Sequence, residues 1–82
     1  MYVIYGQPNC IWCERAKELL DSLIIPYEYY NIVYNREAQW EFVERFPGRK
    51  TVPAIVKLTP NDGDHECMVI GGYEDLVRYL NM

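Results

Sequence analysis

The sequence lacks a cluster of basic residues and any long apolar run. Its 82 residues carry 8 Lys and Arg against 12 Asp and Glu, a formal net charge of −4. Nucleic-acid binding proteins neutralise phosphates with grouped Lys and Arg, so this charge gives no support to nucleic-acid binding. No apolar stretch approaches the roughly 20 residues that a helix needs to cross a bilayer. We therefore expect neither nucleic acid nor a membrane as a partner.

Signals for export are also missing. The start of the chain, Met1 to Tyr5, has no positive charge and is followed by Gly6 and Pro8, which is unlike a secretory signal peptide. We therefore expect a cytoplasmic protein. The chain has only three cysteines, and the cytoplasm would keep them reduced. A closely spaced pair then indicates redox catalysis or metal binding rather than a structural crosslink.

What the sequence does contain is typical of one globular α/β domain. Half of its residues are apolar and 24% are charged, and this length predicts a single domain over residues 1–82. Apolar periodicity and turn residues predict four strands and three helices in the order βαβαββα. The predicted strands are 2–5, 27–33, 54–58 and 65–70, and the predicted helices are 10–25, 36–46 and 74–80. Because a βαβ unit makes parallel strands and a hairpin antiparallel ones, we expect a mixed four-stranded sheet flanked by helices.

The sequence Cys10-Ile11-Trp12-Cys13 opens the first predicted helix. Unpaired N–H groups and the helix dipole favour negative charge at that position, and the thiolate is the reactive form of cysteine. Cys13 lies one turn later on the apolar side of the helix, within reach of a disulfide. This spacing predicts that Cys10 is an exposed attacking thiol and Cys13 a shielded resolving thiol.

The same cysteine pair could instead form half of a zinc site, with His65 and Cys67 as two further ligands. Zinc ribbons usually carry their cysteine pairs on short knuckles, whereas this pair opens a helix and the other two residues alternate along a strand. We therefore favour redox chemistry and expect no bound metal. We interpret Cys67 as a small buried hydrophobe and His65 as an exposed side chain.

With these features the chain resembles the glutaredoxins, members of the thioredoxin-fold superfamily. Three motifs match in order and cover nearly the whole chain. They are the cysteine pair, Thr51-Val52-Pro53 before the third strand, and Gly71-Gly72-Tyr73-Glu74-Asp75 before the last helix. The resemblance implies a thioredoxin fold and a dithiol oxidoreductase. It also implies glutathione as the reductant, with no metal or organic prosthetic group.

The resemblance further implies a glutathione site. Its expected members are Gln7, Trp12, Thr51, Val52, Pro53, Gly72, Tyr73 and Glu74. Val52, before a cis bond to Pro53, would pair its backbone with an extended thiol peptide. The N–H groups of Tyr73 and Glu74 would hold the γ-glutamyl carboxylate, and the side chain of Glu74 or Asp75 would meet the glutamyl ammonium.

Two positions depart from the family pattern. Gln7 stands where many glutaredoxins have a Lys, so we expect weaker glutathione binding unless Arg36 or Gln39 supplies a contact. The usual Pro-Tyr between the cysteines is Ile11-Trp12, in which Trp12 keeps an aromatic surface beside the first cysteine.

These departures leave open which electron donor reduces the protein and whether it carries a metal ion or cluster. Thioredoxin reductase could replace glutathione as the donor, because the position of the usual Lys carries no charge. An iron–sulfur or metal carrier that uses Cys10 is a third possibility, because no Pro follows that cysteine. The family analogy suggests disulfide-containing proteins as acceptors, ribonucleotide reductase among them, and we expect a monomer.

Overall fold

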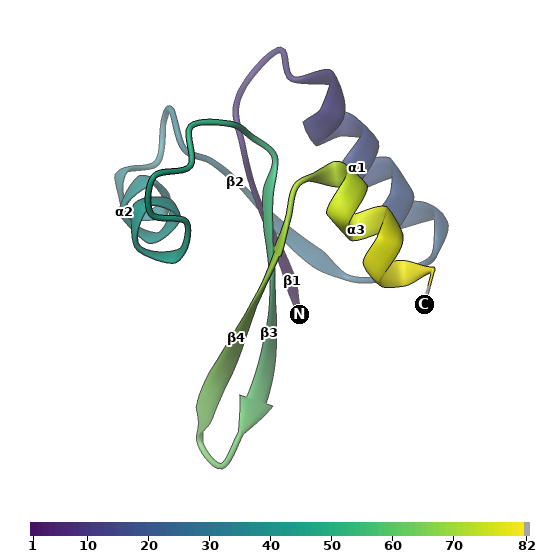
Figure 1. The fold of residues 1–82 in the computed structure, drawn as a ribbon, viewed down its shortest axis with the longest axis vertical. Helices are drawn as coiled ribbons and strands as arrows, with labels where there is room; N and C mark the ends of the chain where they lie inside the picture. Colours follow the sequence, from purple (N-terminus) through teal and green to yellow (C-terminus); the bar gives the residue numbers. More distant parts are fainter. Residues whose placement is uncertain (82) are drawn as a thin grey trace.

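The computed structural model describes residues 1–81, and its seven elements follow the predicted order (Figure 1). The elements are β1 (Tyr2–Gly6), α1 (Ile11–Ser22), β2 (Tyr27–Asn31), α2 (Arg36–Arg45), β3 (Ala54–Asn61), β4 (Asp64–Gly71) and α3 (Tyr73–Leu80). The strands form one sheet in the order β2-β1-β3-β4. β1 is parallel to β2, while the β1–β3 and β3–β4 pairs are antiparallel. This mixed sheet confirms the predicted thioredoxin fold. No helix of residues 1–81 has the length and apolarity that crossing a membrane requires.

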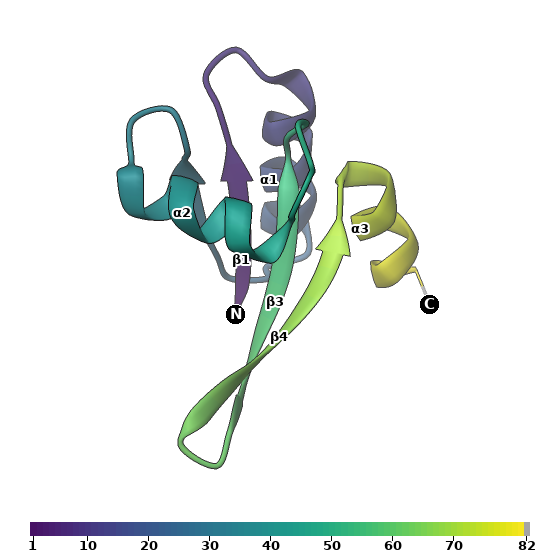
Figure 2. The same ribbon diagram turned by 60° about the vertical axis from the view of Figure 1, so that its left-hand side comes forward.

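The helices cover the two faces of the sheet, with α2 on one side and α1 and α3 on the other (Figures 1 and 2). Every residue of β1 is buried, and successive side chains of a strand point to opposite faces. β1 therefore supplies both cores. The core on the α2 side contains Val3, Tyr5, Ala38, Phe42, Phe46, Ala54 and Val56. The core under α1 and α3 contains Tyr2, Ile4, Ala16, Leu20, Ile55 and Leu76.

Helix α1 ends three residues before its predicted end at residue 25. The amide of Ile24 donates to the carbonyl of Asp21 (3.0 Å), and the amide of Ile25 donates to the carbonyl of Leu20 (2.9 Å). These two bonds form a Schellman motif, which closes a helix through a residue with positive φ. That residue is Ile24, with φ +56 and a side chain that is 90% exposed. The prediction that the helix continues through Ile24 to residue 25 was therefore wrong.

The β3–β4 hairpin is longer than predicted and extends away from the helices (Figure 1). Its turn is only Asp62-Gly63, and both residues have positive φ, +48 and +84. That is the turn type that best fits the twist of a two-residue hairpin. The strands therefore continue through residues 59–61 and 64, beyond the predicted ranges 54–58 and 65–70, while β2 ends at Asn31, two residues before its predicted end.

The prediction that Cys67 is buried was wrong, because this cysteine is exposed and unbonded. β1 pairs with β3 only as far as Lys57, and Cys67 pairs with Leu58 beyond that point. This part of the hairpin extends beyond β1 and away from the three helices (Figure 1). His65 is exposed, as predicted. Trp40 of α2 is 66% exposed, because this helix packs against the sheet along one face only, through Ala38 and Phe42.

Candidate redox site

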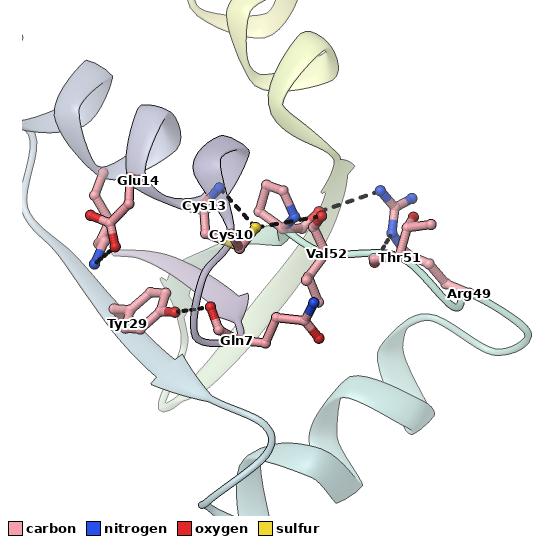
Figure 3. The surroundings of a disulfide bond; sticks show 10 residues. Gln7, Cys10, Cys13, Glu14, Tyr29, Arg49, Thr51 and Val52 are labelled. Atoms are coloured by element: carbon pink, nitrogen blue, oxygen red, sulfur yellow. Dashed lines mark hydrogen bonds and ion pairs between the residues drawn. A yellow bond between two sulfur atoms is a disulfide. The ribbon is translucent and has the colours of Figure 1, made fainter.

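The first cysteine of the pair caps helix α1 with its own sulfur. Cys10 has an extended backbone, and its Sγ accepts a hydrogen bond from the backbone N–H of Cys13 at 3.1 Å (Figure 3). The first amides of a helix have no partner within the helix and carry the positive end of its dipole. This geometry directs the amide end of α1 at Sγ, where negative charge on the sulfur is favoured.

Cys10 and Cys13 form a disulfide, with Cα atoms 5.2 Å apart. Cys10 is partly exposed and Cys13 is completely buried, which is the difference in exposure that the sequence predicts. An incoming thiolate can therefore reach only the outer sulfur. Opening the disulfide takes two electrons and leaves one accessible thiol and one buried thiol.

The Val52–Pro53 loop packs beside the outer sulfur. The peptide bond between the two residues is cis, as the resemblance implies. The carbonyl oxygen of Val52 lies 3.9 Å from Sγ of Cys10 (Figure 3). A peptide backbone that pairs with Val52 would thus bring its own sulfur next to Cys10.

A cleft of about 280 Å³ opens between the start of α1, the cis-proline loop and the start of α3. Its lining residues are Trp12, Arg49, Val52, Pro53, Gly72, Tyr73, Glu74 and Asp75. Six of the eight predicted glutathione-site residues are among them. The rings of Trp12 and Tyr73, with centroids 5.5 Å apart, form one wall.

The other two predicted members, Gln7 and Thr51, do not line this cleft. Gln7 is an exposed loop residue, and its backbone carbonyl accepts a hydrogen bond from the Tyr29 hydroxyl at 3.4 Å. Thr51 is exposed, and its carbonyl faces Arg49. Gln39, suggested as a substitute for the missing Lys, lines a separate cavity beside α2, and Arg36 does not line the cleft either.

The positive charge in the cleft comes from Arg49, which the sequence analysis missed. Its Nε donates to the carbonyl of Thr51 at 3.0 Å, and its Nη2 donates to the carbonyl of Pro53 at 3.3 Å. The guanidinium also lies over the ring of Phe46, 5.6 Å from the centroid. Two basic residues precede Thr51-Val52-Pro53, and the sequence does not indicate which of them turns inward.

The start of α3 holds its two acidic residues differently. Asp75 caps the helix, because its Oδ2 accepts from the backbone N–H of Gly72 at 2.9 Å. Its other oxygen lies 3.4 Å from the guanidinium of Arg78. Glu74 is exposed at the edge of the cleft. Of the two acids proposed for an ammonium group, Glu74 is therefore the one left available.

The charges beside the cysteines on α1 are engaged with neighbouring side chains. The carboxylate of Glu14 pairs with Lys17 at 3.0 Å, and the guanidinium of Arg15 lies 5.2 Å from the centroid of the Trp12 ring. Within residues 1–81 no group of three or more His, Cys, Asp and Glu side chains is arranged to hold a metal ion.

Residues 2–58 match the family model described as Glutaredoxin. The chain is 37% identical to glutaredoxin 3 of Escherichia coli (strain K12) over 73 residues, which is 89% of this chain and 77% of that protein. It is 35% identical to glutaredoxin 1 of Rickettsia felis over 54 residues, 65% of this chain, and spans about half (53%) of that relative's length. The crystal structure of a buckwheat glutaredoxin–glutathione complex shares the fold, with a TM-score of 0.67 and 23% identity over 98% of this chain and 67% of that one.

Proposed function

Because this chain belongs to the glutaredoxin family, we propose that it catalyses thiol–disulfide exchange through Cys10 and Cys13, with glutathione as its reductant. One observation carries the proposal. The partly exposed sulfur of Cys10 lies beside an open cleft and accepts a hydrogen bond from an amide at the start of α1. The sulfur bonded to it, that of Cys13, is buried one helical turn later. That arrangement separates an attacking sulfur from a resolving sulfur.

The reductive half of the reaction begins with the Cys10 thiolate, which the N–H of Cys13 stabilises. The thiolate attacks one sulfur of a substrate disulfide, and the other substrate sulfur leaves as a thiolate that takes a proton from water. The Cys13 thiolate then attacks Sγ of Cys10. This step releases the second substrate sulfur and leaves the substrate reduced by two electrons and the protein oxidised.

Glutathione closes the cycle in two further exchanges. One glutathione thiolate attacks Sγ of Cys10 and frees Cys13. A second glutathione attacks the glutathione sulfur of the mixed disulfide, which yields glutathione disulfide and the Cys10 thiolate. Glutaredoxin potentials of about −200 to −230 mV lie close to the glutathione poise, so this exchange is reversible.

We propose that glutathione lies in the cleft with its γ-glutamyl group toward α3. The N–H groups of Tyr73 and Glu74 and the guanidinium of Arg49 would hold the carboxylate, since helix N-termini and Arg both bind carboxylates. The Glu74 carboxylate would hold the ammonium, and Val52 would pair with the cysteinyl backbone beside Pro53. The buckwheat complex with the same fold supports this ligand.

Four other predicted residues complete the proposed site. Trp12 would cover the cysteinyl side of the ligand, and Gly72 would let it approach the start of α3 closely. Thr51 would act through the backbone carbonyl that orients Arg49. Gln7, an uncharged residue outside the cleft, would contribute little to affinity. We further propose that residues 1–82 act as one domain in a cytoplasmic, monomeric protein whose acceptors are protein disulfides, including ribonucleotide reductase.

The test is turnover with glutathione, NADPH and glutathione disulfide reductase, on a small glutathione mixed disulfide and on a protein disulfide. Cys10→Ser should abolish both activities, because it removes the attacking sulfur. Cys13→Ser should retain the first and lose the second, because only the protein substrate needs the resolving sulfur. Cys67→Ser, at the exposed third cysteine, is the matched control and should retain both. Full activity of Cys10→Ser would refute the assignment.

A second donor is favoured by one feature, the uncharged Gln7 in the position where many family members have a Lys. Thioredoxin reductase would then reduce the Cys10–Cys13 disulfide directly. Reduction of the purified protein by NADPH and thioredoxin reductase, compared with reduction by glutathione, separates the two donors. Faster reduction by glutathione supports the main proposal, and reduction by thioredoxin reductase alone overturns its glutathione step.

A further inference from the structure

The buried sulfur of Cys13 lies beside a tyrosine hydroxyl that the exchange cycle above does not use. Gly6, the last residue of β1, leaves the space in which the two groups meet. A Cβ added at Gly6 would lie 2.6 Å from Oη of Tyr29 and 3.0 Å from Sγ of Cys13. Figure 3 shows Tyr29 of β2 reaching under the disulfide toward the loop that leads to Cys10. The hydroxyl and the sulfur therefore approach the same point.

The Tyr29 hydroxyl makes only one weak hydrogen bond as a donor. It donates to the carbonyl of Gln7 at 3.4 Å, which is long for an O–H···O bond. Nζ of Lys17 lies 4.2 Å from the centroid of its ring, and Lys17 is paired with Glu14. Burial raises the pKa of Tyr29; Lys17 lowers it in part, and Glu14 raises it further. The hydroxyl therefore keeps its proton at neutral pH.

Cys13 needs such a donor when it acts as the resolving sulfur. Burial disfavours the ionised form of a thiol, and a buried charge without a hydrogen bond is costly. The helix amides do not serve Cys13, because its own N–H points to Sγ of Cys10. The Tyr29 hydroxyl of β2, which borders the same space as the Cys13 sulfur, has a proton that it can donate.

We propose that, once the disulfide is open, the Tyr29 hydroxyl donates a hydrogen bond to the Cys13 sulfur and favours its thiolate, so that Tyr29 is a positioning residue for the resolving step. The inference rests on the proposed dithiol function. In this step the Cys13 proton passes to water, and the Cys13 sulfur forms a bond to the Cys10 sulfur. The bond between Cys10 and the substrate sulfur breaks, and that sulfur leaves with the electron pair.

The test compares Tyr29→Phe with Tyr27→Phe, both in a Cys67→Ser background that removes the third thiol. Tyr27 is the matched control, because it lies two residues away on the same face of β2 and its hydroxyl donates to Asp21 at 3.2 Å. Reduced protein is mixed with glutathione disulfide, quenched in acid at short times and weighed by mass spectrometry. The decay of the Cys10–glutathione species to the intramolecular disulfide gives the resolving rate at each pH.

Tyr29→Phe should slow that decay about tenfold at neutral pH and move its pH midpoint up by about one unit, since a hydrogen bond to a charged group is lost. Tyr27→Phe should change neither quantity, and formation of the mixed disulfide at Cys10 should be equal in all variants. Equal resolving rates in wild type and Tyr29→Phe, or equal slowing in Tyr27→Phe, would overturn the inference.

A second measurement needs no turnover. In a variant that carries Cys10→Ser and Cys67→Ser, only the Cys13 thiol remains, and the NMR shift of its Cβ reports its ionisation. Adding Tyr29→Phe should move this titration to higher pH, and an unchanged titration would contradict the hydrogen bond. Failure of the proposed function looks different, because wild-type protein would then form no mixed disulfide with glutathione at all.

Discussion

The guanidinium of Arg49 is the cation that lines the cleft, and replacing it tests the proposed glutathione-binding site. Arg49→Gln removes the charge that we assign to the γ-glutamyl carboxylate. Hydrogen bonds to charged groups contribute about 1.5–3 kcal/mol, and exposed ion pairs contribute less than about 1 kcal/mol. Arg49 is half-buried and already held by two carbonyls, so we expect a loss of about 1–2 kcal/mol. This equals a 5- to 30-fold rise in the KM for glutathione.

Lys50→Gln is the matched control, because it removes the same charge from the adjacent, exposed residue that does not line the cleft. Its KM for glutathione should stay within about twofold of wild type, given how little an exposed charge contributes. Both variants are also assayed with dithiothreitol, which lacks a carboxylate. An equal loss of activity with both reductants in Arg49→Gln would mean that Arg49 only holds the cis-proline loop. An unchanged KM for glutathione would refute the contact altogether.

Two predictions concern stability. Ile24→Gly should raise the free energy of unfolding by about 0.5–1 kcal/mol, because φ +56 is costly for a β-branched residue and a 90% exposed side chain gives up little burial. Thermal unfolding measures this change. The control Ser22→Gly, at the last residue of α1, should lower stability instead. Burial and the hydrogen bond to Glu41 raise the pKa of Tyr5, with Arg45 opposing, so the fold favours the protonated phenol. This stabilisation is complete below the unfolded pKa of 10.0 and is lost as the pH rises toward the folded value. Tyr5→Phe should reduce the alkaline loss of stability by up to about 1.4 kcal/mol per pH unit in urea titrations, and an unchanged slope would contradict it.

Short-range pattern was enough to predict the order of the elements and the position of the cysteine pair. The apolar run of β1, buried on both faces, indicates a central strand before any pairing is known. Asn is a favoured residue at a helix N-cap, and the Asn35 side chain caps α2 by accepting a hydrogen bond from the amide of Ala38 at 3.0 Å. These features depend on neighbours within a few residues, so the sequence contains the information that decides them.

Tertiary structure decided which residues the fold covers and which it brings together. Cys67 is exposed because its strand continues past the end of β1, and the length of a strand does not show what lies beside it. Arg49 enters the cleft because two carbonyls of the cis-proline loop and the ring of Phe46 hold it there. The Tyr29 hydroxyl and the Cys13 sulfur border the same space, which Gly6 leaves open. The contacts of Arg49 are local, but the cleft that it enters is built from three segments far apart in sequence. The distances between such segments are set by strand pairing and helix packing, which no local pattern records.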